Sequence, residues 1–553
     1  MNLNFKKYFQ HPALIYIIYI IFIILCSPSG FSWLNKIIFS LCALVPFWIV
    51  REKLLNYKKA NILPINLSKY NKYFVALLCF ALFFFIASKI FLFIKYGIAP
   101  LGYDTGFYLR GVSAMGLATT KLNAVNAYYF IFTPLLSLGM EPLIAFYSIC
   151  IFSQFLTLIA LCFLLKTFRS PTSFNLAIIA IFLYAMSSVQ FLGYWNVFGQ
   201  QLLAMPFLLI SVALLMRRSV LAIFTAGITF LLHTATAGVL FLGIAIYYII
   251  YFFQLFSKNR YCYKSHFSIV IIGIVLAVPF YILKSITFKG QLDYIIHFGG
   301  LLKNVPFWQI PELSGFFIGI QQFNILTLFI IPLALTTLLN PAVWLREKVN
   351  KSFFFNSLLI NYVFLALLAI LALSPVIYQT RFNLMLDLFL IIFATPTILI
   401  LIEYFIKDKT GRLILLAMIF LFTVNFCLIA NKQQPLISKS ELQEIKSLAS
   451  KVESNAKIMT TSSTYTPWLY GFYGREVIAP GRLGDTWELE TWKEFWFGDS
   501  DKKRLELLKT RPMPLYVYIG EKELDGNPYQ NFVNNDPHFE NITEHLWKFK
   551  QEL

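Results

Sequence analysis

Apolar stretches long enough to cross a membrane recur throughout the first 431 residues. A helix of about 20 residues spans the hydrocarbon core of a bilayer, where only helices and closed barrels satisfy every backbone hydrogen bond. Hydrophobic residues make up 58% of the chain and charged residues only 13%, which excludes an ordinary soluble globular protein. The sequence therefore predicts an α-helical polytopic membrane protein.

About thirteen transmembrane helices are predicted. Two stretches need separate treatment: 127–139 is expected to be peripheral or re-entrant, and 219–256 is expected to be two helices broken near His233. The expected spans are 13–28, 33–50, 73–95, 142–165, 174–192, 198–216, 219–232, 235–256, 267–285, 314–340, 353–373, 385–406 and 411–431.

The charge distribution predicts how these helices are oriented. The net charge is +19, yet only nine of the 27 acids precede residue 431, and the basic excess lies in short loops between apolar stretches. Such loops stay in the cytoplasm under the positive-inside rule, and the thirteen spans place all of them on one side. We expect a multi-pass protein of the plasma membrane with a cytoplasmic N-terminus. The charge indicates topology and gives no reason to expect nucleic-acid binding.

The last 122 residues differ from the rest, with 18 acids and 16 basic residues. Glu441–Val452 has the spacing of an amphipathic helix, whereas Ala456–Thr461 and Leu515–Gly520 are typical of buried strands. We expect a transmembrane domain over 1–431 and a small extracytoplasmic α/β domain over 432–553. An aromatic stretch that begins at Tyr465 is predicted either as ordinary core or as a lid and saccharide platform.

The segment Pro100–Gly111 places Asp104 directly after a predicted span. A carboxylate near hydrocarbon costs about 3 kcal/mol even on lenient insertion scales, so it needs a specific reason to be there. Sugar transfer from a lipid phosphate needs a base that deprotonates the acceptor, and an acid just outside the bilayer can meet both substrates. Asp104 is the candidate catalytic residue. The alternative is an interfacial aspartate that caps the next helix.

Two other polar residues are candidates for substrate binding. Arg110 can hold a donor phosphate, since a guanidinium binds phosphate oxygens in a bidentate manner; alternatively it extends to the lipid headgroups. His233, between two apolar stretches, contacts donor or acceptor at a broken helix, or is a satisfied core histidine.

Later segments supply further candidates. Arg381 and Asp387 are six residues apart, about 240° around a helix, so they should not pair with each other in a continuous helix. Arg381 is interpreted either as a ligand of lipid phosphate or as half of a structural ion pair. Glu312 is interpreted either as a second acid of the site or as a solvated loop residue.

Several motifs are absent from the sequence. It has no phosphate-binding loop, no Rossmann fingerprint, no His-Glu-x-x-His and no Gly-x-Ser-x-Gly, which argues against ATP-driven transport and metalloprotease activity. No paired Asp-x-Asp lies near a membrane boundary. We therefore assign no metal ligand and no certain cofactor, and leave a divalent cation open.

The sequence resembles the GT-C superfamily of glycosyltransferases that use polyprenyl-phosphate sugars. This superfamily includes protein O-mannosyltransferases, lipid A aminoarabinose transferases and the catalytic subunits of oligosaccharyltransferases. Gly-Tyr103-Asp104-Thr-Gly-Phe-Tyr108-Leu-Arg110 is similar to the family pattern Asp-x-x-x-Tyr/His-x-Arg. Tyr378-Gln-Thr-Arg381-Phe is similar to a Tyr-x-x-Arg-Phe at an outer helix end. The predicted layout of spans and external domain also matches.

The resemblance implies an inverting glycosyltransferase with Asp104 as base and Arg381 as a ligand of the donor phosphate. The donor would be a polyprenyl-phosphate sugar in the lipid bilayer, and the acceptor an extracytoplasmic glycan, lipid or protein. The residues assigned to substrate binding are Tyr103, Tyr108, Arg110, His233, Glu312, Tyr378 and Arg381. The chain departs from oligosaccharyltransferases in lacking Trp-Trp-Asp-Tyr-Gly, for which Trp468-Leu-Tyr-Gly471 is a distant counterpart.

Two other functions fit the same features. A flippase of lipid-linked glycans, or a polysaccharide transporter, would share the topology and the arginines but would leave the bond between phosphate and sugar intact. A non-catalytic membrane scaffold would use the aromatic part of the C-terminal region to bind a partner and would tolerate substitution of Asp104.

Overall fold

The computed structural model describes most of the C-terminal region and a large part of the helical region. The described residues are 71–99, 102–117, 128, 131–167, 173–196, 198–217, 219, 221–257, 324–339, 379–462, 464–473, 477–479, 487, 489–521 and 528–552. The expected spans 13–28, 33–50, 267–285 and 353–373 lie outside these residues, as do Glu312 and Tyr378.

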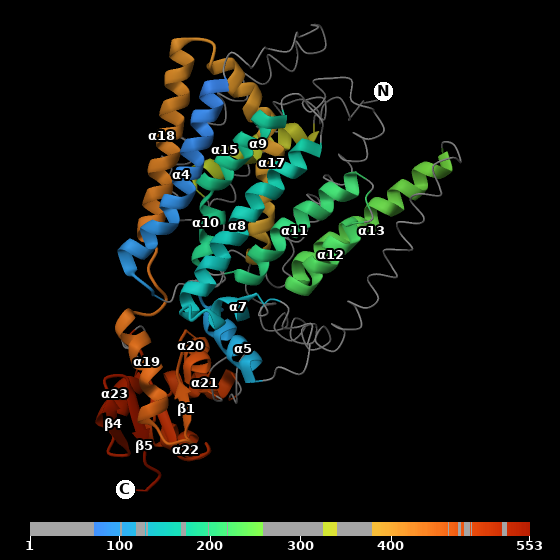
Figure 1. Ribbon diagram of the computed structural model, residues 1–553. Coiled ribbons are helices and arrows are strands. Elements are labelled where there is room, and N and C mark those ends of the chain that lie inside the picture. The colour runs from blue at the N-terminus through green and yellow to red at the C-terminus, as the bar shows by residue number, and fades with distance from the viewer. Residues whose placement is uncertain are drawn as a thin grey trace, which may run out of the picture.

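The N-terminal part of the described chain is a bundle of apolar helices (Figure 1). Within the described ranges, five helices are long and apolar enough to cross a membrane, and a bent pair adds a sixth if it counts as one span. The five are α4 (Asn71–Tyr96), α8 (Pro142–Thr167), α11 (Gly199–Met216), α17 (Gln379–Phe405) and α18 (Lys409–Lys432). The chain is therefore a multi-pass membrane protein.

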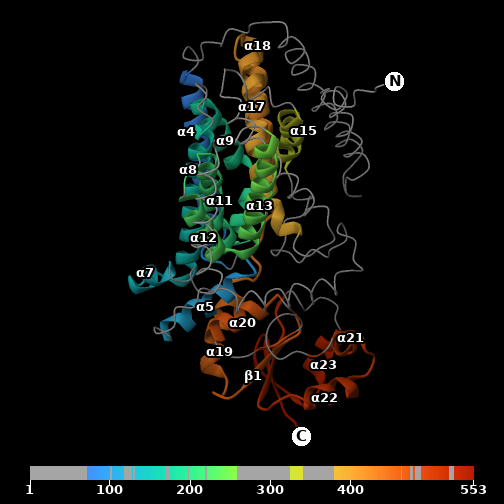
Figure 2. The same cartoon turned by 90° about the vertical axis from the view of Figure 1, so that its right-hand side faces the viewer.

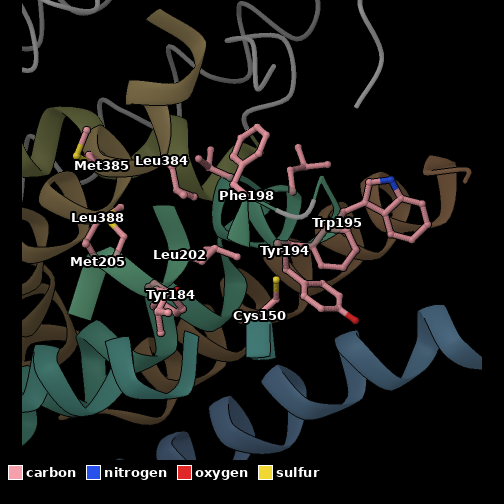
Figure 3. Close-up of a cluster of buried hydrophobic side chains, with 14 of the residues drawn as sticks. Cys150, Tyr184, Tyr194, Trp195, Phe198, Leu202, Met205, Leu384, Met385 and Leu388 are labelled. Atoms are coloured by element: carbon pink, nitrogen blue, oxygen red, sulfur yellow. The ribbon is translucent and has the colours of Figure 1, made fainter. Parts of the chain in front are cut away.

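Other helices complete the bundle. They are α9 (Ser173–Met186), α10 (Ser188–Trp195), α12 (Leu221–Leu232), α13 (Thr234–Ser257) and α15 (Ile325–Leu339). The break predicted near His233 is present, because α12 ends at Leu232 and α13 begins at Thr234. Large apolar side chains from several helices of the bundle, Tyr194, Leu202 and Leu388 among them, pack together in its interior (Figure 3).

The prediction of one span over 174–192 is wrong in its shape. The chain bends by 55° between α9 and α10. Ser187 lies at the bend, and its hydroxyl accepts a hydrogen bond from the backbone N–H of Gln190, so it caps α10. The amide of Asn324 donates to the carbonyl of Met186, at the end of α9, over 2.8 Å. Side chains thus satisfy the backbone groups that the break leaves open.

One end of the bundle carries the part of the chain that follows α18, which we name the C-terminal domain (Figure 2). Helix α18 leads into it, and the end of α4 is fixed beside the end of α18, because Lys95 Nζ donates to both the backbone and the side-chain oxygen of Asn431. At the same end, α7 (Phe132–Ser137) extends sideways from the bundle. With six residues it is too short to cross a bilayer, and it falls in the stretch expected to be peripheral or re-entrant.

The C-terminal domain contains a five-stranded mixed sheet in the order β2-β1-β3-β5-β4. Strands β2, β1 and β3 are parallel, and β5 is antiparallel to both β3 and β4. The strands are β1 (Lys457–Thr460), β2 (Val477–Ile478), β3 (Leu515–Tyr518), β4 (Phe539–Thr543) and β5 (Leu546–Phe549). The helices are α19 (Lys439–Lys451), α20 (Thr466–Tyr473), α21 (Leu489–Phe497), α22 (Asp501–Lys509) and α23 (Pro528–Asn535).

Most of the aromatic stretch is core. Tyr465, Trp468, Trp492 and Phe495 are buried, and Trp492 packs against both Phe495 and Trp496. The platform interpretation is limited to the partly exposed members of the stretch. Among these, Tyr470 lies on α20, the helix that faces the bundle (Figure 1).

Candidate functional site

The candidate site lies where the C-terminal domain meets α5 (Thr105–Leu117), the helix that follows α4 (Figures 1 and 2). Helix α5 crosses α20 so closely that the backbones of the two helices are in direct contact. A methyl group on Gly106 would overlap the carbonyl of Pro467, and one on Gly471 would overlap the carbonyl oxygen of Gly106. The close crossing therefore requires a glycine on each helix.

A second contact joins the two domains beside this crossing. Lys446 Nζ on α19 lies 3.4 Å from a carboxylate oxygen of Glu141 and 5.1 Å from the ring centre of Phe472 on α20. The other oxygen of Glu141 accepts the backbone N–H of Ile144 in the first turn of α8. Because this ion pair is partly exposed, it contributes little to stability. It does show that α19 lies against the start of α8.

Asp104 lies at the start of α5 and is buried, with 7% of its surface exposed. Its carbonyl oxygen accepts the N–H of Tyr108 over 3.1 Å, the first hydrogen bond of the helix. The aspartate therefore occupies the capping position that the sequence allowed as an alternative. This position also places the residue beside Gly106, where α5 crosses α20.

A stripe of half-buried side chains runs along the α5–α20 crossing. Phe107 and Arg110 are three residues apart on one face of α5, and Tyr103, two residues before the helix begins, precedes Phe107 by four. The ring centres of Tyr103 and Phe107 are 6.2 Å apart, and that of Phe107 is 6.1 Å from that of Tyr470. The guanidinium carbon of Arg110 lies 5.6 Å from the Tyr470 ring centre, in cation–π range. Both domains thus contribute to one aromatic and cationic surface.

Tyr108 lies on another face of α5 and packs into the bundle. Its ring centre is 5.2 Å from that of Tyr128 and 5.8 Å from that of Phe146. A methyl group on Gly199, the first residue of α11, would overlap the hydroxyl of Tyr128 and lie 3.7 Å from the Tyr108 ring. These contacts seat α5 on the start of α11.

His233 has a structural role in the turn between α12 and α13. Its Nδ1 accepts the backbone N–H of Thr236 over 3.2 Å and lies 2.7 Å from the Thr236 hydroxyl, so the ring caps α13. The half-buried ring lies at the same end of the bundle as α5, because α11 starts beside α5 and α12 returns along it. The satisfied-histidine interpretation accounts for these contacts.

Arg381 lies in the first turn of α17. Helix α18 follows α17 and leads to the C-terminal domain, so α17 begins at the end of the bundle where α5 lies. The fold therefore brings the α5 segment, the His233 turn and the start of α17 to one end. Within the described residues, no three His, Cys, Asp or Glu side chains gather as a metal site would require.

Sequence reasoning missed Tyr470 and the two glycines as members of this site. The sequence feature that could have identified them is Trp468-Leu-Tyr-Gly471. Its glycine leaves no side chain on that face of α20, so another helix can approach the backbone there. The partners of Asp387 were also left open. They are Ser187 and Gln190, 2.8 and 2.9 Å from one carboxylate oxygen, and Thr327, 3.4 Å from the other.

No family model matches this sequence, and no curated protein matches it. Solved structures do. The oligosaccharyltransferase of Archaeoglobus fulgidus, with a tethered acceptor peptide containing the NVT sequon, is 13% identical over 82% of this chain and 69% of its own, with a TM-score of 0.53. Its apo form is 12% identical over 80% and 69%, with a TM-score of 0.51.

A third structure, ArnT from Cupriavidus metallidurans bound to undecaprenyl phosphate, is 11% identical over 86% of this chain and 98% of its own, with a TM-score of 0.43. The fold comparison rests on the oligosaccharyltransferase, whose TM-scores exceed 0.5 in both forms. The chain shares the fold of this oligosaccharyltransferase.

Proposed function

We propose that this protein is an integral membrane glycosyltransferase that moves a sugar from a polyprenyl-phosphate carrier to an acceptor outside the cytoplasm. The observation that carries the proposal is the position of Asp104, buried at the start of α5 where α5 crosses α20 of the C-terminal domain. At that junction a carboxylate can face an acceptor from water and a donor from the lipid. The fold shared with an oligosaccharyltransferase supports the same reaction class.

In the proposed reaction, Asp104 takes the proton of the acceptor hydroxyl or amide as that atom attacks the anomeric carbon. The bond between the anomeric carbon and the phosphate oxygen breaks, and the polyprenyl phosphate leaves with the bonding electrons. A single displacement of this kind inverts the anomeric configuration. Burial of the carboxylate suits a base, because the site excludes competing water.

The leaving phosphate needs positive charge beside it. Arg110, on the half-buried stripe of α5, and Arg381, at the start of α17, are the proposed ligands, since a guanidinium fork matches phosphate oxygens. The ring of Tyr470, which already lies against Arg110, is proposed to border the acceptor side. His233 contributes by fixing the turn at this end of the bundle.

A transporter of lipid-linked glycans is the second candidate. The observation that favours it is the bend between α9 and α10 with the buried carboxylate of Asp387 beside it, because transporters often place their sites at discontinuous helices. A transporter would move the donor without breaking its bond between phosphate and sugar.

A doubly labelled donor separates the two functions. Membranes containing the wild-type protein would receive polyprenyl-phosphate sugars labelled in both the lipid and the sugar, drawn from a panel of hexoses and pentoses. A glycosyltransferase separates the two labels and releases free polyprenyl phosphate. Labels that change leaflet together and stay joined would contradict the proposed function and support the transporter.

A further inference from the structure

Helix α10 is buried along its whole length, although it is only eight residues long. It follows the bend at Ser187 and ends at Trp195, just before α11 begins at Gly199. An isolated helix of this length is not stable by itself. Its position must therefore be set by what surrounds it, and two buried ionisable side chains lie beside it.

The first of these side chains, Asp387 on α17, contacts the first turn of α10. Its carboxylate, with 0% of the residue exposed, accepts from the hydroxyl of Ser187, the capping residue, and from the side-chain amide of Gln190. The same amide donates to the backbone oxygen of Leu384 over 3.0 Å. An anion at this end is favourable, because the start of a helix carries partial positive charge.

The second side chain, Lys89 on α4, lies beside the later half of α10. Only 4% of the lysine is exposed. Its Nζ is 5.2 Å from the ring centre of Phe191 and 4.7 Å from that of Tyr194, both on α10, and 5.3 Å from that of Phe85 on α4. Tyr194 extends from α10 toward α4 (Figure 3). A buried ammonium is held well by several aromatic faces.

We propose that Asp387 and Lys89 are positioning residues that hold α10 in place from two sides. The acid lies at the positive end of the helix dipole, and the cation lies toward its negative end. Each charge also gains local contacts from α10, hydrogen bonds for the carboxylate and aromatic faces for the ammonium. Together they fix α10 between α17 and α4.

The end of α10 connects directly to the candidate site. The backbone N–H of Asn196 donates to Leu192, and that of Phe198 donates to Gly193, so the link to α11 is an extension of α10. The next residue, Gly199, packs against the rings of Tyr128 and Tyr108 that seat α5. Tyr108 follows Asp104 by four residues, about one helical turn. The catalytic consequence of this inference rests on the proposed function: a shift of α10 moves the base.

The test compares Asp387→Asn, Lys89→Met and Lys89→Arg with the wild type and with Lys72→Met, a control at the exposed start of α4. Hydrogen exchange of the full-length protein is followed over residues 188–198, with α19 as an internal reference. We expect Asp387→Asn and Lys89→Met to speed exchange of that segment about tenfold or more. Lys89→Arg, which keeps a cation against the rings, should stay near the wild type, as should the control.

Transfer kinetics give the second readout. Asp387→Asn and Lys89→Met should lower kcat at least about tenfold with little change in the donor KM, since misplacement of a catalytic group by about 1 Å costs rate. Unchanged exchange in both variants, or the same exchange in Lys89→Met and Lys89→Arg, would overturn the inference. If the wild type transfers no sugar, the proposed function fails, and the exchange result still decides whether these charges hold α10.

Discussion

The hydrogen bond between His545 and Glu444 ties α19 to the turn between β4 and β5. His545 Nδ1 lies 2.6 Å from a carboxylate oxygen of Glu444, and the Thr543 hydroxyl donates to the other oxygen. The hydrogen bond with Glu444 raises the pKa of His545 despite burial. Burial would raise the pKa of Glu444, but the hydrogen bonds from His545 and Thr543 outweigh it and lower that pKa.

These shifts predict how stability of the C-terminal domain depends on pH. His545 contributes fully to the free energy of unfolding below its ordinary pKa of 6.5. This contribution is lost as pH rises through the raised pKa of the folded state. Glu444 contributes fully to the free energy of unfolding above its ordinary pKa of 4.5. This contribution is lost as pH falls through the lowered pKa of the folded state. Thermal unfolding should therefore show higher stability at pH 5.5 than at pH 8. His545→Gln should flatten this difference, and an unchanged slope in the variant would contradict the assignment.

Some of the important residues could be identified from the sequence, whereas others could not. Asp104 could be found because it stands next to a predicted span, where a carboxylate is costly. The pairing of Glu444 with His545 could not, because the two are about 100 residues apart and nothing local marks either one. The partners of Asp387 were equally hidden, since Ser187 and Thr327 come from distant helices and their types are common in membrane spans.

At the scale of elements, the crossing of α5 and α20 connects the two domains most closely. Gly471→Ala would place a methyl group against the carbonyl of Gly106, and overpacking of this kind costs about 1–3 kcal/mol. We expect the variant to loosen the C-terminal domain from the bundle and to reduce transfer. Limited proteolysis in the 433–438 linker between α18 and α19 measures the loosening.

Gly238→Ala is the matched control, because that helical glycine has open space around the position of a Cβ. It should behave as the wild type does. Equal protection of the linker in Gly471→Ala and in the wild type would mean that the crossing tolerates a side chain and does not fix the domain.

The bend at Ser187 shows why one element was predicted wrongly. The sequence from 174 to 192 is predominantly apolar, and hydropathy cannot distinguish a straight helix from a bent pair. A Ser187-Ser188 pair is a common place for a kink, but serine is also frequent in straight membrane helices. Only the bonds from Asn324 and to Asp387, which come from other parts of the chain, decide the shape.

At the scale of the molecule, apolar length and charge distribution predicted a helical membrane domain followed by a distinct C-terminal region. The proposed orientation places that region outside the cytoplasm. A cysteine at exposed Asp499 should then react with a membrane-impermeant maleimide in intact cells. A cysteine at Lys409, exposed at the opposite end of α18, should react only after the cells are broken. The reverse pattern would contradict the proposed orientation. It would also contradict the proposal that the candidate site lies outside the cytoplasm.

The central claim is that Asp104 is the base of a sugar transfer reaction. The most direct measurement is the initial rate of sugar release from the polyprenyl-phosphate donor by Asp104→Asn, with Asp499→Asn as a control on an exposed carboxylate. Loss of a general base costs about a hundredfold to ten-thousandfold in rate. We predict a loss of at least about a hundredfold for Asp104→Asn with normal expression, and none for Asp499→Asn. Wild-type rates in Asp104→Asn would contradict the account.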